Sequence, residues 1–374
     1  MNVAVSEAFL LTSLGEDADM LYANVSAAFR NEEMIEIARE AYGENDSVVL
    51  RTCPIPLPGR TRLSAIIPEL LGKVFVDMER HIRRHLAAGD KVRLHMLAPP
   101  AEASRSELLA PHVQLDWLSR TSDVMERVET TAGDSQSATA DLIDCCRSLA
   151  EGEYDAVYFG GIDSLISSAT FNELFEQGRI PRDPAAGAVS PGEGVAFIGL
   201  RRIEEGDTAS VKLSAAAVTT VETESVVSRA DALARSLSRA GTTPEGGQRG
   251  ITEVIHDLQG EEDRVREWML AQDRVWPNRL PESLRQAIQD GKLESADNPD
   301  EIAVQVTEIA DTLGCPGAVS LPVSLAVGYG KLNCARVFRG FGCPMPTELL
   351  VVDASSSQSR GAVRLSLAEH TNES

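Results

Sequence analysis

Residues 154–200 read YDAVYFGGIDSLISSATFNELFEQGRIPRDPAAGAVSPGEGVAFIGL, and this stretch is the most informative part of the chain. Residues 156–159 and 195–200 are runs of mostly apolar side chains, which is typical of strands buried on both faces. The Gly160-Gly161 pair follows the first run, and the sequence PGEG at residues 191–194 precedes the second. We therefore expect two buried strands here, each flanked by glycines.

Apolar runs and helical patterns alternate along the rest of the chain. Residues 47–51, 92–97, 211–218 and 361–367 are predicted strands, and residues 225–240 form a predicted amphipathic helix. A second helix is predicted between residues 51 and 89, because apolar side chains recur there at helical spacing: Leu70, Leu71, Val74, Phe75, Met78 and Ile82. This alternation predicts the α/β fold class.

The chain is acidic, with 35 Lys and Arg against 57 Asp and Glu and a net charge of −22. Such a charge repels nucleic acid and anionic membrane, so we expect neither as a partner. The start of the sequence has no signal-peptide pattern, and the uncharged residues 312–330 hold two prolines and four glycines, which favours a buried core segment over a membrane span.

The cysteines and histidines predict neither a metal site nor a disulfide framework. The six cysteines show no CxxC spacing, which indicates free thiols in a reducing cytoplasm. His81 and His85 have the spacing of a metal pair but no third ligand, so we interpret them as part of a solvated basic turn. The sequence predicts no cofactor.

The segments GGIDSL (residues 160–165) and PGEGVAFIGL (residues 191–200) resemble paired landmarks of the β-ketoacyl synthases, which belong to the thiolase superfamily. The resemblance implies a thiolase-like fold, with two similar α/β halves in a five-layered α-β-α-β-α arrangement. We place the halves at residues 1–220 and 221–367, with a polar tail at 368–374. The resemblance also implies a homodimer, with the strand at residues 154–159 at the subunit interface.

In ketosynthases the nucleophilic cysteine lies at the N-terminus of the helix before the GG pair, where the helix dipole stabilises a thiolate. Counting back from Gly160 places that position at Ser135, at the start of a helix predicted over residues 135–151. A serine without a paired base is a poor nucleophile, and the neighbouring Asp134 opposes an anion. The alternative is that Asp134 or Ser135 simply caps the helix.

Two histidines of the ketosynthase site have only partial counterparts. His256 follows a predicted strand at the expected place, where it is either a retained site histidine or a polar residue at a strand end. Residues 310–317 resemble the family's GHTLGAAG turn, but Asp311 replaces the second histidine, and an ionised carboxylate repels a developing oxyanion. The family's lysine and its terminal FGFGG turn are also missing, so the departures from the family are correlated.

We therefore interpret the chain as a non-catalytic ketosynthase-like protein, a pseudoenzyme that acts as a binding, adaptor or assembly partner. Its segment around residues 257–268 resembles one found in degenerate ketosynthase-like proteins associated with type VI secretion effector clusters, which implies a secreted effector as a partner. Four of the matching residues form a predicted local polar network: Asp257, Gly260, Arg264 and Glu267. The other two matching residues are Glu261 and Trp268.

Two alternatives remain open. One is an acyltransferase or thioester hydrolase related to 3-oxoacyl-ACP synthases that uses Ser135 or His256. The other is a regulator that binds an acyl chain or an acyl carrier protein without turnover. Acyl carrier proteins are acidic and need a basic docking patch, for which the candidates are Arg80, Arg83 and Arg84, or Arg201 and Arg202.

Overall fold

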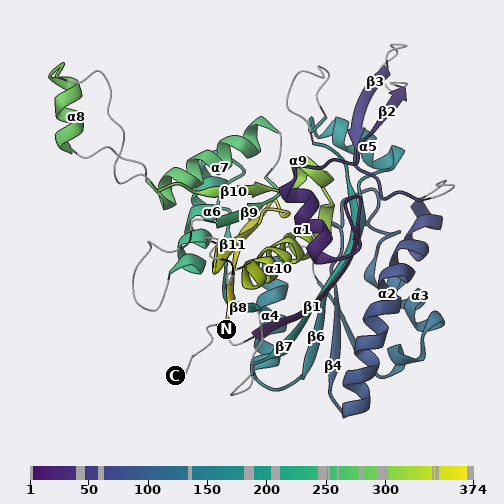
Figure 1. Cartoon of the computed structure of the whole chain (residues 1–374). Helices are drawn as coiled ribbons and strands as arrows, with labels where there is room; N and C mark the ends of the chain where they lie inside the picture. The colour runs from purple at the N-terminus through teal and green to yellow at the C-terminus, as the bar shows by residue number, and fades with distance from the viewer. Residues whose placement is uncertain are drawn as a thin grey trace, which may run out of the picture.

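The computed structural model describes residues 3–38, 47–57, 63–133, 137–180, 189–203, 211–242, 251, 253–258, 261–277, 282–292, 302–338, 341 and 345–368, and every structural statement below concerns these residues. They form one ten-stranded sheet, a separate two-stranded hairpin and the helices that cover them (Figure 1).

The ten strands divide into two sets of five with the same order. The first set runs β5-β4-β6-β7-β1 and the second runs β10-β9-β11-β12-β8, so each reads third, second, fourth, fifth, first along its own part of the chain. The strands of the first set are β1 (Val3–Thr12), β4 (Val92–Met96), β5 (Glu129–Ala132), β6 (Ala156–Ser164) and β7 (Glu193–Arg202). Those of the second are β8 (Val211–Thr220), β9 (Glu253–His256), β10 (Gln305–Glu308), β11 (Glu348–Asp353) and β12 (Ser359–Leu367).

The pairing directions repeat as well. In each set the first three strands in space are parallel, and the other two are added antiparallel. A short antiparallel pairing of β1 with β8, from Val3 with Leu213 to Val5 with Val211, joins the sets. The prediction of two similar α/β halves is therefore confirmed. Our division at residue 220 falls at the end of β8, whereas the strand order groups β8 with the second set.

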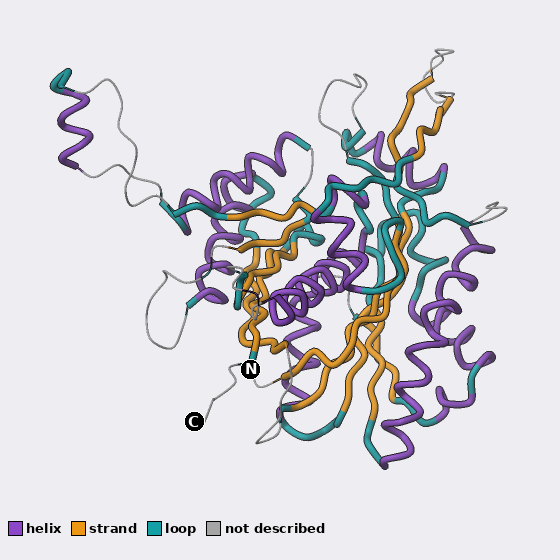
Figure 2. The backbone as a smooth tube through the Cα atoms, in the orientation of Figure 1, coloured by secondary structure: helices purple, strands orange, loops and turns teal. Residues whose placement is uncertain are grey.

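Helices cover and separate the two sets in five layers (Figure 2). The outer face of the first set packs against α2 (Leu63–Ala88) and α3 (Pro111–Thr121), and that of the second against α6 (Val226–Gly241) and α7 (Glu262–Val275). Between the sets lie α4 (Ala138–Ala150) and α10 (Ser320–Phe338), whose apolar side chains share one core with both. This is the predicted α-β-α-β-α arrangement.

Shorter elements complete the fold. They are α1 (Ala18–Ser26), the hairpin strands β2 (Glu33–Ala38) and β3 (Ser47–Thr52), the 3-10 turns Asp123–Glu126 and Gly317–Val319, α5 (Ser168–Glu176), α8 (Glu282–Gln289) and α9 (Ala310–Leu313). The strand predicted at residues 47–51 thus belongs to the hairpin, which projects from the main sheet (Figure 1).

The uncharged residues 312–330 lie mainly in α9 and α10, between the two sets of strands, as the core segment that we predicted. Small residues are needed there, because a Cβ atom at Gly330 would lie 2.3 Å from the carbonyl oxygen of Ala18. No helix in the described part of the chain is both long and apolar enough to cross a membrane.

The Gly160-Gly161 pair lies inside β6, not in a turn after it. Gly160 pairs with Phe197 of β7, and a Cβ atom at Gly160 would lie 1.9 Å from the carbonyl oxygen of Ala196. The expectation that this strand lies at a subunit interface was wrong, because β6 runs between β4 and β7 and is buried along its whole length. Its consecutive apolar side chains are covered by helices of the same chain.

Candidate functional site

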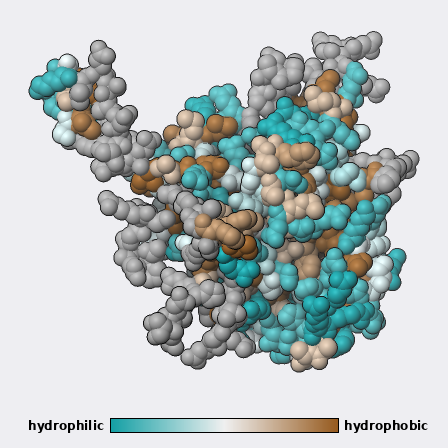
Figure 3. Space-filling view, viewed as in Figure 1, coloured by the Kyte–Doolittle hydropathy of each residue, from teal (hydrophilic) through white to brown (hydrophobic). Residues whose placement is uncertain are grey.

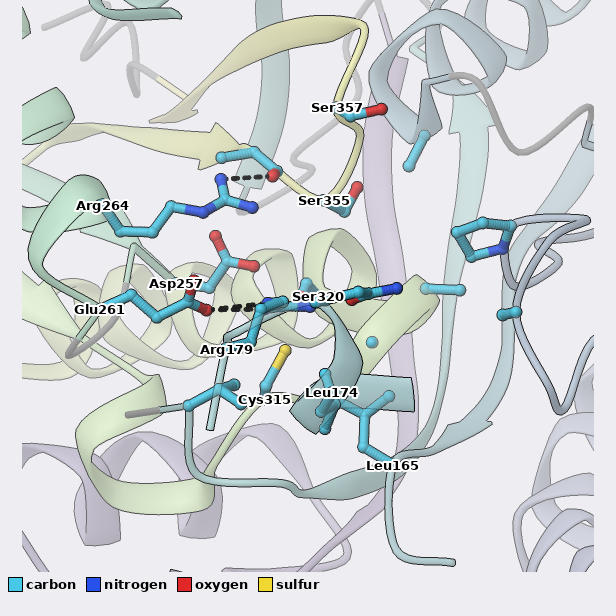
Figure 4. A pocket seen from close by; sticks show the side chains of 18 of the residues that line it. Leu165, Leu174, Arg179, Asp257, Glu261, Arg264, Cys315, Ser320, Ser355 and Ser357 are labelled. Atoms are coloured by element: carbon cyan, nitrogen blue, oxygen red, sulfur yellow. Dashed lines mark hydrogen bonds and ion pairs between the residues drawn. The ribbon is translucent and has the colours of Figure 1, made fainter. Parts of the chain in front are cut away.

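A cavity of about 550 Å³ lies where the two sets of strands meet (Figure 4). The segments that follow β4, β9 and β11 reach it through Leu97, Asp257 and Ser355, and the beginnings of α4 and α10 reach it through Ala138 and Ser320. In open α/β sheets, the carboxyl ends of parallel strands and the N-termini of helices are the usual place for a ligand. The cavity is therefore the candidate functional site.

Each of the two sequence landmarks contributes one buried carboxylate, and neither carboxylate is part of the cavity lining. Asp163 of GGIDSL is fully buried and accepts from Arg105 Nε and Nη2 at 2.6 and 2.9 Å. Its Oδ2 also accepts from the backbone N–H of Ala318 at 2.7 Å, which ties β6 to the turn before α10. Glu193 of PGEG accepts from the Ile55 N–H and the Ser164 hydroxyl. Asp163 thus fixes Arg105 and Ala318, which both line the cavity.

Arginines paired with carboxylates form much of the lining. Arg360 Nε and Nη2 donate to the buried Glu267 at 2.5 and 3.1 Å, and Arg229 Nε donates to the same carboxylate at 2.9 Å. Arg179 donates to Glu261 at 2.8 and 3.1 Å. Because each of these guanidinium groups faces a carboxylate, their charges are largely compensated.

Arg264 differs from the four lining arginines that pair with carboxylates, which are Arg105, Arg179, Arg229 and Arg360. It donates from Nη1 to the Ala354 carbonyl oxygen at 2.9 Å, and no carboxylate in the described part of the chain forms an ion pair with it. Burial and the neighbouring Arg360 lower its pKa. Beside it, burial raises the pKa of the Asp257 carboxyl, and Ser320 and Arg264 oppose that shift.

Ser135, the predicted nucleophile position, lies outside the described residues, as does Asp134. Helix α4 begins at Ala138, and its N-cap is Ser137, whose hydroxyl accepts from the Ala140 N–H at 3.2 Å. The prediction that Asp134 or Ser135 caps this helix was therefore wrong, because the first helical turn starts three residues later than expected.

His256 and Asp311 do not line the cavity. The His256 ring is 1% exposed and packs against Trp268, with 4.6 Å between ring centroids. Its Nδ1 accepts from the Leu258 N–H at 3.2 Å, and burial lowers its pKa to about 4. Asp311 is exposed on α9, where burial and then Asp311 itself raise the pKa of Glu308. The structure thus brings neither residue to the site.

The segment at residues 257–268 does reach the site, although Gly260 lies outside the described residues. Asp257, Glu261 and Arg264 line the cavity, while Glu267 holds two of its arginines and Trp268 covers His256. The predicted local network is not formed among these described residues, because Arg264 donates to the Ala354 carbonyl oxygen and Glu267 pairs instead with Arg229 and Arg360. The arginines that the sequence analysis missed in the lining come from distant parts of the chain: Arg105, Arg179, Arg229 and Arg360.

Thiol chemistry has no ready group among the described residues. Cys315 lines the cavity, but burial raises its pKa and the nearby Arg179 offsets this only in part. Cys145 is buried in α4, where burial raises its pKa to about 12. Ala138 stands where α4 meets the cavity. Within the same residues, no cluster of three or more His, Cys, Asp or Glu side chains is placed to hold a metal ion.

Asp353 occupies the start of the segment that replaces the glycine turn of ketosynthases. Its Oδ2 accepts from the N–H and hydroxyl of Thr139 at 2.9 and 2.8 Å, and its Oδ1 accepts from the Ser355 hydroxyl at 2.6 Å. A carboxylate, and not a set of free backbone donors, thus faces the first turn of α4.

No family model matches the chain, and no curated protein matches it either. Solved structures do match over nearly its whole length. A ketosynthase in complex with its chain length factor from Xenorhabdus doucetiae is 12% identical, with a TM-score of 0.67 and 98% of both chains covered. An oxazolomycin ketosynthase domain from Streptomyces albus is 10% identical, with a TM-score of 0.67, 99% of this chain and 75% of that one covered. The ishigamide ketosynthase/chain length factor is 13% identical, with a TM-score of 0.61 and 98% and 99% coverage. The chain therefore has the fold of the ketosynthases.

Proposed function

We propose that this chain is a ketosynthase-like protein without ketosynthase chemistry, which acts as a binding, adaptor or assembly partner. The observation that carries the proposal is the cavity at the N-terminus of α4. Ion-paired arginines and carboxylates line it, and its one cysteine in the described lining, Cys315, is held in the neutral form by burial.

Acyl transfer needs a nucleophile, a base and donors for the oxyanion acting on one atom. His256 is turned into the core formed with α7, and Asp311 is an exposed carboxylate outside the cavity. An acyl chain in the cavity would also displace water from the charged side chains that line it. This loss of hydration costs free energy that an apolar ligand does not offset. These features favour a polar ligand or a protein segment over an acyl thioester.

A protein partner is supported by two observations. Ketosynthases with this fold occur in complexes with a chain length factor or an acyl carrier protein. The residue pattern at 257–268, which carries the resemblance to proteins of type VI secretion effector clusters, borders the cavity. We propose a secreted effector as the partner class.

The regulator that docks an acyl carrier protein is less well supported. Arg80 pairs with Asp77, and Arg83 pairs with Glu79 and Asp123, so carboxylates within the chain already compensate two of the three arginines of this patch. An acidic carrier protein would compete with those carboxylates for the same guanidinium groups. Arg201 and Arg202 remain as the other predicted docking patch.

The proposal is tested by incubating the full chain with an acyl thioester of N-acetylcysteamine and measuring the intact mass. We expect the mass to stay that of the unmodified chain. An added acyl group that disappears in Ser135→Ala, a variant matched in size, would establish the acyltransferase alternative and overturn the proposal. An adduct that persists in Ser135→Ala but disappears in Cys315→Ala would overturn it through a different nucleophile.

A further inference from the structure

The cavity contains a cation and a carboxyl group that the rest of the chain leaves without strong partners. Four of the five arginines in the described lining donate hydrogen bonds to a carboxylate, whereas Arg264 donates only to the Ala354 carbonyl oxygen and forms no ion pair with a described carboxylate. A guanidinium group that is withdrawn from water without a counter-ion destabilises the folded chain. The other four arginines stabilise the fold by pairing with carboxylates, and Arg264 has no such role in the described part of the chain.

The acceptor side of the same space is also incomplete. Asp257 Oδ1 and Ser320 Oγ are both buried and lie close enough for Ser320 to affect the Asp257 pKa, but neither atom makes a hydrogen bond of good geometry with any described residue. Both residues line the cavity, and Figure 4 shows the Asp257 carboxylate beside Arg264, with Ser320 and Ser355 bordering the same space. Buried polar atoms without partners are rare in folded proteins and mark places where a ligand or water completes the site.

The charge of the lining limits what the ligand is. Its described residues include five arginines and seven carboxylates, so two negative charges are in excess. A multiply charged anion such as a phosphate ester would meet net repulsion there. A single carboxylate is suited to Arg264, because the planar guanidinium matches a carboxylate with two parallel hydrogen bonds. A positive group next to that carboxylate is suited to Asp257.

We infer that the cavity binds an α-amino carboxylate, with its carboxylate on Arg264 and its ammonium group on Asp257 Oδ1 and Ser320 Oγ. The inference rests on the proposed function, since it gives the site a ligand and no reaction. The volume of about 550 Å³ exceeds what a small amino acid fills, so a free amino acid with a long side chain and a larger conjugate bearing the same group are both accommodated.

The test uses the full chain and the common L-α-amino acids, each added at millimolar concentration while thermal unfolding is followed, with calorimetric titration of any that raise the melting temperature. We expect at least one to bind, and its amide and its N-acetyl derivative to bind at least about tenfold more weakly, because each lacks one of the two charges. Arg264→Met should abolish the binding, and Asp257→Asn should weaken it by at least about tenfold.

The matched control is Arg360→Met, which removes another arginine from the same lining. Its unliganded melting temperature should fall, because Glu267 then loses its bidentate partner, whereas Arg264→Met should unfold at or above the wild-type temperature. If Arg264→Met does not fold, Arg264→Lys provides an independent test, because lysine keeps the charge but lacks the planar guanidinium group. It should bind at least about tenfold more weakly.

The inference is overturned if no amino acid binds, or if Arg264→Met binds as the wild type does. Equal binding of the N-acetyl derivative would overturn the assignment of the ammonium group to Asp257 and would point to the carboxyl terminus of a peptide instead. These outcomes leave the proposed function untouched, and an acyl adduct in the mass experiment would overturn that function without deciding this site.

Discussion

His256 is held uncharged inside the second half of the molecule. Its ring lies between the end of β9 and Trp268, and Nε2 has no hydrogen-bond partner among the described residues. Protonation would place a charge where neither water nor a close carboxylate compensates it, since Glu308 Oε1 is 3.9 Å from Nε2 and is half exposed. His256 is therefore a buried residue of the second half and does not line the cavity.

This burial makes a pH-dependent contribution to stability. The His256 pKa falls from 6.5 in the unfolded chain to about 4 in the folded one, so the unfolded chain takes up the proton first as the pH falls. The contribution is complete above pH 6.5 and is lost as the pH falls towards 4. We expect the wild type to lose roughly 3 kcal/mol relative to His256→Asn over that window. Urea unfolding of both proteins at several pH values measures the difference, and a difference that does not change with pH would contradict this account.

Some residues of the candidate site could be predicted from the sequence and others could not. The pattern Asp257, Glu261, Arg264 is local, and these three side chains do converge on the cavity. In contrast, the neighbouring residues His256 and Asp257 point in different directions, because successive side chains of an extended segment alternate between its two faces. Asp257 therefore faces the cavity and His256 does not. Arg105, Arg179 and Arg360 reach the site only through the tertiary fold, so no spacing in the sequence points to them.

At the scale of elements, β6 and β7 approach each other as closely as their backbones allow. A Cβ atom at Gly160 would lie 1.9 and 2.7 Å from backbone atoms of the neighbouring strand. Because these are backbone atoms, no change of side-chain conformation would relieve the contact. Gly160 therefore permits the pairing of β6 with β7, whereas the sequence analysis placed the GG pair just after the predicted strand.

We expect Gly160→Ala to destabilise the chain by about 1–3 kcal/mol or more, because the strands must separate to admit the methyl group. Gly194→Ala is the matched control in β7, since its Cβ atom would meet side-chain atoms at 3.6 Å or more, which is ordinary contact. Urea denaturation of the three proteins compares them. Equal stability of Gly160→Ala and the wild type would show that the close pairing is not required.

At the scale of the whole molecule, the duplicated strand order could be foreseen from the resemblance, but what covers β6 could not. Consecutive apolar residues in β6 indicated burial correctly and did not say what covers them. In the first set, β5 forms the end of the sheet, pairs only with β4 among the described strands, and is largely exposed. An exposed sheet edge is a common place for a second chain to pair.

We still predict a homodimer in solution. An obligate interface buries more than about 2,000 Å² and persists at micromolar concentration. Light scattering should therefore return about twice the chain mass of 40.2 kDa. A mass of one chain at that concentration would contradict the prediction.

The central claim is that this ketosynthase fold carries no ketosynthase chemistry. A thiolate, a pair of histidines and oxyanion donors act as a unit in that reaction, so replacing one of them does not restore it. Ser135→Cys supplies only the thiol, while Asp134 still opposes the thiolate and the two histidine positions still hold a buried ring and an exposed carboxylate.

The most direct measurement is the formation of the condensed β-ketoacyl product from an acyl thioester and a malonyl thioester, with the wild type, with Ser135→Cys and without protein. The account predicts no product above the protein-free control for either protein. Turnover by the wild type would contradict the central claim, and turnover by Ser135→Cys alone would show that only the nucleophile is missing and that the rest of the catalytic site is intact.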